Sequence, residues 1–546
     1  MMQKRIVTLI LCFACLNLNA AAQHEGHAMP DAPAAPKPIE LLPTDAFVHL
    51  SVDTRRMKAQ QFFDQGLTLY YAFNDGDAVR SFRRAAEYDP QLAMAYWGVA
   101  LAAFPRGTGG GNRNDEKRLK EASGAMKKAM SMPASDADRT YIEALSKLFS
   151  DDPKVDRGQL ENAYRVEMAQ IYKRWPGDPD AAALYALSIF YSQIGDNWTP
   201  AGKPTGKAQE MVDVLEAGLR RSPTHLGLTH IYIHAVEDSL EPERALDAAD
   251  ALRGLKINIP AFGHLVHMPA HIYVRAGNFQ RSVESNEETA RMPTDTLSDD
   301  FKLWHYNHVL NFLLFAYGMQ GNYARTADTL ERTFGFKSPR TTDQRPRYLV
   351  RFRKWDDILK LPPQPADAPV RLAVNLAWAR TMALVNIGKL TEAAAERGIY
   401  RAGAKRLSDE IAKRGDREQS EVLANIAAID DARIAAAMAV ARGDRKAAIE
   451  FLRNAVAAED KLPYSEPPLS VSPARESLGG QLLLDGQFAE AEIVFREDLK
   501  RNRGSGRAYF GLMRSLEGQR KDAASARRDF ENAWKFADFA VTEKDL

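Results

Sequence analysis

The stretch Phe62–Pro90, FFDQGLTLYYAFNDGDAVRSFRRAAEYDP, decides the fold. Gly66 and Ala78 are small, so two antiparallel helices can approach closely at these positions. Phe82 is spaced to fill the gap between the two helices. Pro90 cannot continue a helix and ends the unit. The stretch therefore predicts a pair of packed helices that is followed by another unit.

Turn-then-helix signatures recur along the chain, at Gly277, Gly321, Gly388, Gly443 and Gly486. No alternating strand pattern of useful length interrupts them. These landmarks resemble the tetratricopeptide repeat (TPR), a helical pair of fixed period. The resemblance implies an all-α, right-handed TPR-like helical solenoid with a concave groove, in which each repeat buries its apolar face against its neighbours. In such solenoids the groove binds a protein or peptide partner.

More narrowly, the chain resembles a group of exported bacterial TPR proteins of similar length that are rich in histidine. The segments that carry this resemblance include HIYIHAVE at His230–Glu237, GHLVHMPAHIYVR at Gly263–Arg275 and EPP at Glu466–Pro468. The chain departs from the group at Asn311, where a second histidine often follows His308. The resemblance implies the fold and export but no reaction.

The composition is that of a folded protein with interleaved charges. Hydrophobic residues make up 45% of the 546 residues and charged residues 27%, and the formal net charge is +1. This balance argues against a nucleic-acid partner. We expect five segments: a signal peptide at 1–22, a flexible Ala/Pro-rich leader at 23–45, TPR-like repeats with the histidine cluster at 46–337, an irregular connector at 338–369 and C-terminal TPR-like repeats at 370–541.

The N-terminus has the organisation of a secretory signal. Lys4 and Arg5 precede an apolar run from Ile6 to Leu18, and three alanines at 20–22 offer a cleavage site. No later segment is long and apolar enough for a transmembrane helix. We therefore expect an exported protein, periplasmic or secreted. Both cysteines lie inside the signal, so the mature chain would have no disulfide.

Histidines are concentrated in one part of the chain. Eight of the 11 lie between His225 and His308. In one segment, His230, His234 and Glu237 follow helical spacing and share a face. A second segment repeats this pattern at an offset of 37 residues, which indicates equivalent faces of two successive repeats.

The second segment contains His264, His267 and His271. Imidazole with carboxylate suits zinc, copper or iron, so the sequence predicts a transition-metal site on the wall of the groove. Four histidines form its core and three residues are further ligands or neighbours: His230, His234, His267 and His271, then His264, Glu237 and His308. Ligating nitrogens must be unprotonated, so we expect metal binding to weaken below about pH 6.5.

Two alternatives to the metal site stay open, namely a hydrogen-bonded imidazole network and a recognition surface without metal. His49, His225 and His305 are interpreted as ordinary structural histidines. The function is then an exported scaffold, a metal-dependent enzyme of oxidative or hydrolytic type, or a metal carrier or sensor. No catalytic residue is identified. The segment GKPTGKA at Gly202–Ala208 lacks the spacing and the hydroxyl of a phosphate-binding loop, so no nucleotide is expected.

We predict that the mature protein begins near Gln23, because the alanines at 20–22 precede it. Intact-mass analysis of protein recovered from the exported fraction measures this directly. A mass that includes Met1, or one that carries a lipid on Cys15, would contradict the prediction.

Overall fold

A computed structural model describes residues 39–546 except 45–46, 107–112, 153, 194–196, 200, 294–304, 336–343, 366–367 and 416. The predicted signal peptide and most of the predicted leader, with His24 and His27, lie outside the described residues. Residues Ile39–Leu546 form one compact unit.

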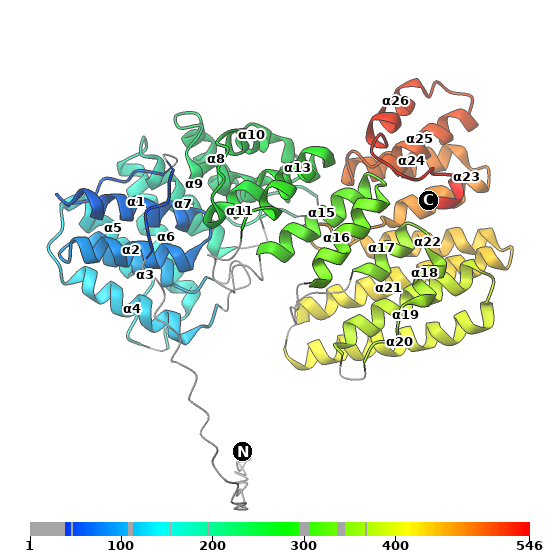
Figure 1. The fold of residues 1–546 in the computed structure, drawn as a ribbon, viewed down its shortest axis with the longest axis horizontal. Coiled ribbons are helices and arrows are strands. Elements are labelled where there is room, and N and C mark those ends of the chain that lie inside the picture. The colour runs from blue at the N-terminus through cyan, green and yellow to red at the C-terminus, as the bar shows by residue number, and fades with distance from the viewer. Residues whose placement is uncertain are drawn as a thin grey trace, which may run out of the picture. The chain divides into compact units, whose positions relative to one another are not determined.

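Helices follow one another along the chain, and most of them pack against the next (Figure 1). The helices before the histidine segments are α1 (Met57–Tyr71), α2 (Asp75–Tyr88), α3 (Ala93–Ala103), α4 (Glu116–Met130), α5 (Asp136–Ser146), α6 (Arg157–Arg174), α7 (Pro179–Ser192) and α8 (Ala208–Leu219). Those that carry or flank the histidine segments are α9 (Leu226–Val236), α10 (Leu246–Gly254), α11 (Gly263–His267), α12 (Pro269–Arg275), α13 (Phe279–Ala290), α15 (Asn307–Met319) and α16 (Tyr323–Gly335).

The remaining helices are α17 (Arg345–Arg351), α18 (Trp355–Lys360), α19 (Val370–Asn386), α20 (Leu390–Lys413), α21 (Arg417–Ala441), α22 (Arg445–Glu459), α23 (Ala474–Leu484), α24 (Phe488–Arg501), α25 (Gly506–Gly518) and α26 (Ala524–Ala533). The described part of the chain holds no strand beyond one isolated bridge between Trp198 and Pro204. The all-α helical solenoid predicted from the sequence is confirmed. Among the described residues, no helix has both the length and the hydrophobicity that a membrane-spanning segment needs.

The first repeat is built as its sequence predicts. Phe82 of α2 is fully buried and packs edge-to-face on Phe63 of α1. Gly66 and Gly98 both face its ring: a Cβ atom at Gly98 would lie 2.3 Å from Cδ1 of Phe82. The small residues therefore let α1 and α3 close on the aromatic ring. Asn74 starts α2 by accepting a hydrogen bond from the backbone N–H of Asp77.

The turns between paired helices also match the prediction. Gly277 separates α12 from α13 and Gly321 separates α15 from α16, with φ angles of 77° and 71°. These left-handed conformations favour glycine, which has no Cβ to clash. The same turn fixes the repeat register on which the positions of the histidines depend.

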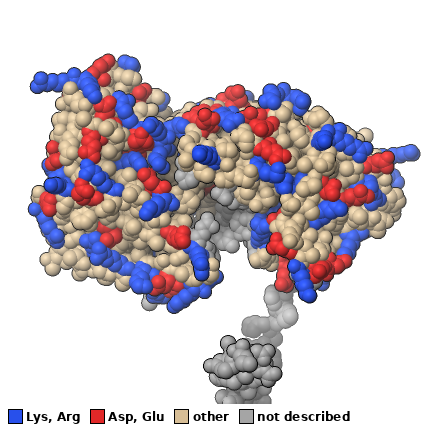
Figure 2. Space-filling model, turned by 180° about the vertical axis from the view of Figure 1, so that it is seen from behind, with Lys and Arg blue, Asp and Glu red and all other residues tan. Residues whose placement is uncertain are grey.

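One expected segment is more ordered than its sequence indicates. The proposed irregular connector at 338–369 contains the two short helices α17 and α18, which pack on each other and on α19. Helices α17 and α18 are shorter than the helices of the other pairs, so the sequence landmarks of the repeat did not indicate them. The connector thus continues the stack of helices. On the face seen in Figure 2, basic and acidic side chains are intermixed, in line with the near-zero net charge.

We predict that Phe82→Ala lowers the free energy of unfolding by about 3–5 kcal/mol, the range for emptying a buried aromatic site. The matched control is Phe451→Ala, because Phe451 is 38% exposed on α22; it should lose far less. Denaturant unfolding of the variants measures both effects. Equal losses would place Phe82 outside the packed core.

Candidate metal centre

The predicted metal ligands lie inside the protein. His230, His234, His264, His267 and His271 are between 0% and 7% exposed. The expectation that they line an open groove is wrong at this point of the solenoid. His308, on α15, is half-buried and marks the edge of the cluster.

The end of α1 covers the first histidine segment. Helix α1 packs against α9, although seven helices separate them in the chain. The carbonyl oxygen of Tyr71 accepts a hydrogen bond from Nδ1 of His230 at 2.5 Å. Phe73 places its ring 4.5 Å from that of His230 and 5.5 Å from that of His234. Phe73 has a φ of 56°, which is unfavourable for a bulky residue and indicates that the surrounding contacts hold it there.

The ligand candidates form two groups of three histidines. In each group, one ring nitrogen of every member lies within 4.8 Å of those of the other two. The first triad is His230, His234 and His264, and the second triad is His267, His271 and His308. The structure thus brings together all six histidines but divides them, where the sequence suggested that His230, His234, His267 and His271 share one ion.

Three ring nitrogens converge in the second triad. Nε2 of His271 lies 2.8 Å from Nε2 of His267 and 3.4 Å from Nε2 of His308. Tetrahedral coordination at metal–nitrogen distances of about 2.0–2.1 Å places ligand nitrogens at a similar separation. The arrangement therefore needs little movement to hold a metal ion.

The hydrogen bonds on the opposite ring nitrogens fix the tautomers. Asn286 donates to the carbonyl oxygen of Ser282, so its own Oδ1 faces Nδ1 of His267 at 2.6 Å and must accept from it. His267 consequently carries its proton on Nδ1 and presents a lone pair on Nε2. Metal-binding histidines almost always have such an acceptor on the second nitrogen.

His271 is held by two carboxylates. Its Nδ1 lies 2.5 Å from Oε2 of Glu237 and 2.6 Å from Oε2 of Glu466. Burial opposes protonation of the ring, but the attraction of Glu466 and Glu237 prevails and raises the pKa of His271 to about 10. The second proton lies on Nε2, between the rings of the second triad. A metal ion bound to that nitrogen takes the place of this proton.

The other histidines of this triad are kept neutral. Burial holds the pKa of His267 and of His308 well below the usual value, and the charge on His271 adds to the effect. Neutral imidazole is the form that binds metals. The second triad thus pairs two neutral rings with one ring that would give up a proton if it bound a metal ion.

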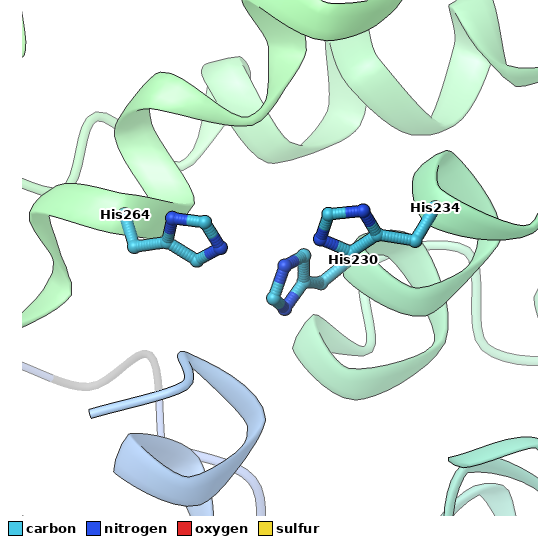
Figure 3. Close-up of side chains that lie close together, drawn as sticks. All are labelled: His230, His234 and His264. Carbon is cyan, nitrogen blue, oxygen red and sulfur yellow. The ribbon is translucent and has the colours of Figure 1, made fainter. Parts of the chain in front are cut away.

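The first triad lies between α9 and α11. Figure 3 shows His264 pointing from its helix toward His230 and His234. The Nδ1 atoms of His230 and His234 donate to the Tyr71 carbonyl and to Oε1 of Glu237, the latter at 2.6 Å. Their Nε2 atoms are buried and have no hydrogen-bond partner. Two buried lone pairs without a partner are costly, and a bound metal ion would satisfy both.

Glu237 connects the two triads. Its two oxygens contact one histidine of each, and its side chain is buried. Burial alone would raise its pKa, but His234 and His271 together lower it well below the usual value. The carboxylate is therefore ionised. Glu237 lies beside both triads as the hydrogen-bond partner of their rings, and it also belongs to a group with His234, His271 and Glu466 that could itself hold an ion.

Glu466 is the one member of the centre that the sequence did not single out. It lies in the segment between α22 and α23, and its side chain is 34% exposed. Burial, and next the negative charge of Glu237, raises the pKa of Glu466. The only available signal was the segment EPP at Glu466–Pro468, where the resemblance to exported TPR proteins extends into a non-helical stretch.

The other histidines have separate roles. His225 begins α9 by accepting from the backbone N–H of Leu228, and His49 contacts Asp64 at 2.8 Å. Both are structural, as expected. His305 is buried 5.6 Å from His264, ring centre to ring centre, and burial lowers its pKa to about 3.

No family model and no curated protein sequence matches the chain. Structures with a related succession of helices are those of the human IFIT1 dimer with m7Gppp-AAAA, the P58(IPK) TPR domain and yeast Tom70. IFIT1 is 12% identical with a TM-score of 0.29, over 89% of this chain and 92% of its own. The P58(IPK) domain is 12% identical at 0.20, over 85% and 98%, and Tom70 is 11% identical at 0.24, over 89% and 93%. Such low similarity supports no conclusion about the site.

We predict that Asn286→Ala weakens transition-metal binding by about 10–100-fold, the usual effect of removing a partner that orients a ligand. Competition with a chromophoric chelator measures the affinity. Asn375→Ala is the matched control, because Asn375 is also a buried asparagine but lies on α19, outside the centre. Unchanged affinity in Asn286→Ala, at unchanged helical content, would show that Asn286 does not position a ligand.

Proposed function

We propose that this chain is an exported helical-repeat scaffold that holds a transition metal ion in a buried histidine centre. The observation that carries the proposal is the convergence of three Nε2 atoms in the second triad. Two of those rings, His267 and His271, are oriented by acceptors on their other nitrogen. Convergent donors with such support are what a metal site needs.

The metal would link successive repeats. His267 and His271 come from α11 and α12, and His308 comes from α15 in the following repeat. The first triad similarly joins α9 to α11, beneath the end of α1. A bound ion would therefore stabilise the curvature of the solenoid. On this view the protein or peptide partner binds elsewhere in the concave groove, because the histidines themselves are buried.

Zinc, copper and iron are the candidate metals, since imidazole suits all three. Three histidine ligands leave room for a fourth, and zinc sites with three protein ligands commonly bind water there. Export is part of the proposal and rests on Lys4, Arg5 and the apolar run that follows.

A metal-dependent enzyme is the second candidate, and one observation favours it. His308 and Glu466 are the partly exposed members of the centre. A small substrate would reach the second triad at this edge, with the raised pKa of Glu466 suited to proton transfer. A metal carrier or sensor would use the same edge for exchange of the ion. The scaffold ranks first because the other histidines are enclosed.

We predict that untagged protein from the exported fraction contains at least about one transition-metal ion per chain, as expected for a site of three imidazoles. His308→Ala should lose the ion of the second triad, and it should keep the fold because His308 is only half-buried. His49→Ala is the control, because it removes an exposed histidine that lies outside the centre.

Elemental analysis with circular dichroism measures metal and helix together. Wild-type protein that stays metal-free after dialysis against zinc, copper and iron salts would contradict the proposed centre. Equal metal content in His308→Ala and His49→Ala would contradict the role of the second triad. Metal-dependent turnover of a small substrate, lost in His308→Ala, would favour the enzyme over the scaffold.

A further inference from the structure

We propose that the C-terminal repeats contain a binding site for a small amphipathic anion, with an oxyanion head group on an apolar body. The site is distant from the histidines in sequence and is independent of the metal centre. The proposal is based on a cavity, on the charged side chains that line it and on the hydrogen bonds that its arginines form.

The cavity has a volume of about 350 Å³. It lies among α17, α19, α21, α22, α23 and α25, and the last residues of the chain, Lys544–Leu546, contribute to its wall. Pockets for small molecules usually measure about 300–1,000 Å³. A compact ligand therefore fits.

Basic side chains dominate the charged lining. Against two acidic residues, Glu476 and Asp545, the wall contains six basic ones: Arg351, Arg353, Arg433, Arg445, Arg507 and Lys544. Over the whole chain the charges balance closely, with 73 basic and 72 acidic residues. The excess of positive charge is thus a local property of this cavity.

Three of these arginines bind only neutral oxygen atoms. Arg433 donates to the carbonyl oxygen of Ser472 at 2.7 Å and toward Oγ of Ser477 at 3.4 Å. Arg445 donates to the carbonyl oxygen of Leu484 at 2.9 Å. Carbonyl acceptors orient these guanidinium groups without neutralising them.

Arg507 is held in the same way. It donates to the carbonyl oxygens of Arg351 and Asp545 at 2.6 and 2.7 Å. None of the ion pairs among the described residues includes Arg433, Arg445 or Arg507. The Nε atoms of Arg445 and Arg507 are buried and have no hydrogen-bond partner. Arg507 is buried, and Arg433 and Arg445 are half-buried. Buried charge is expected to be paired, so an anion in the cavity would supply the missing counter-charge.

Burial in the cavity wall disfavours the charged form of two of its arginines. Burial, and next the nearby charge of Arg351, lowers the pKa of Arg507 to about 9. Burial also lowers the pKa of Arg433. In both cases burial, which disfavours the charged form, outweighs the acidic groups nearby. Arginine recognises carboxylate and phosphate through paired N–H donors, so an oxyanion is the matching ligand.

Much of the remaining wall is apolar and selects the body of the ligand. It includes Val350, Met382, Val385, Val440 and Leu452. A fully hydrated inorganic ion would leave this surface without contact. An apolar group attached to the anion would cover it, which adds favourable burial.

The test compares three ligands of one shape on the full chain by calorimetry: 2-naphthyl phosphate, 2-naphthoate and the neutral 2-naphthol. We expect the anions to bind at least about tenfold more tightly than naphthol, as charge-assisted hydrogen bonds to arginine imply. The stronger of the two anions identifies the head group. Equal affinity of all three, or no binding by any, would overturn the proposal.

Variants assign the effect to the cavity. Arg433→Gln and Arg445→Gln should each weaken binding of the preferred anion by about tenfold or more while affecting naphthol little. Arg406→Gln is the control, because this arginine is 69% exposed on α20 and lies outside the cavity. An equal loss in the control would overturn the assignment, because it would show a general effect of net charge.

Discussion

The histidine centre depends on one buried carboxylate. Glu237 places one oxygen on Nδ1 of His234 and the other on Nδ1 of His271. Because a carboxylate only accepts hydrogen bonds, both rings must carry a proton on Nδ1 and direct Nε2 away from Glu237. Nε2 of His234 therefore faces the first triad, and Nε2 of His271 faces the second. If Glu237 were turned or protonated, neither triad would have all of its ring nitrogens in place, although every histidine would remain on its helix.

The parts of this arrangement that depend on local spacing could be predicted from the sequence. His230 and His234 share a face of α9, and the 37-residue offset places His267 and His271 at the matching positions of the next repeat. The glycine turn at Gly277 fixes that register. Helical spacing and turn chemistry are properties of short segments, so a single sequence contains them. This is why the succession of paired helices could be predicted, and why the six histidines of the two triads could be expected to lie near one another.

The rest depended on contacts between distant segments. Tyr71 and Phe73, at and just after the end of α1, cover the first triad, and Glu466 reaches His271 from a non-helical segment near the C-terminus. Neither contact has a periodic signal. The division into two triads depends on ring orientations that Asn286 and the Tyr71 carbonyl determine. A stripe of histidines specifies a face, but the acceptors behind each ring specify where its nitrogens point.

In the first triad, Nε2 of His230 and Nε2 of His234 are buried, and no protein group forms a hydrogen bond with them. A metal ion bonds to lone pairs of this kind. Both cysteines lie in the predicted signal, so a mature exported chain would have no disulfide to link its repeats. An ion that binds only the folded protein, at a concentration of about 1,000 times its Kd, stabilises the fold by about 4 kcal/mol. That is comparable to a disulfide, so the centre would serve as the covalent-like link between repeats that the chain otherwise lacks.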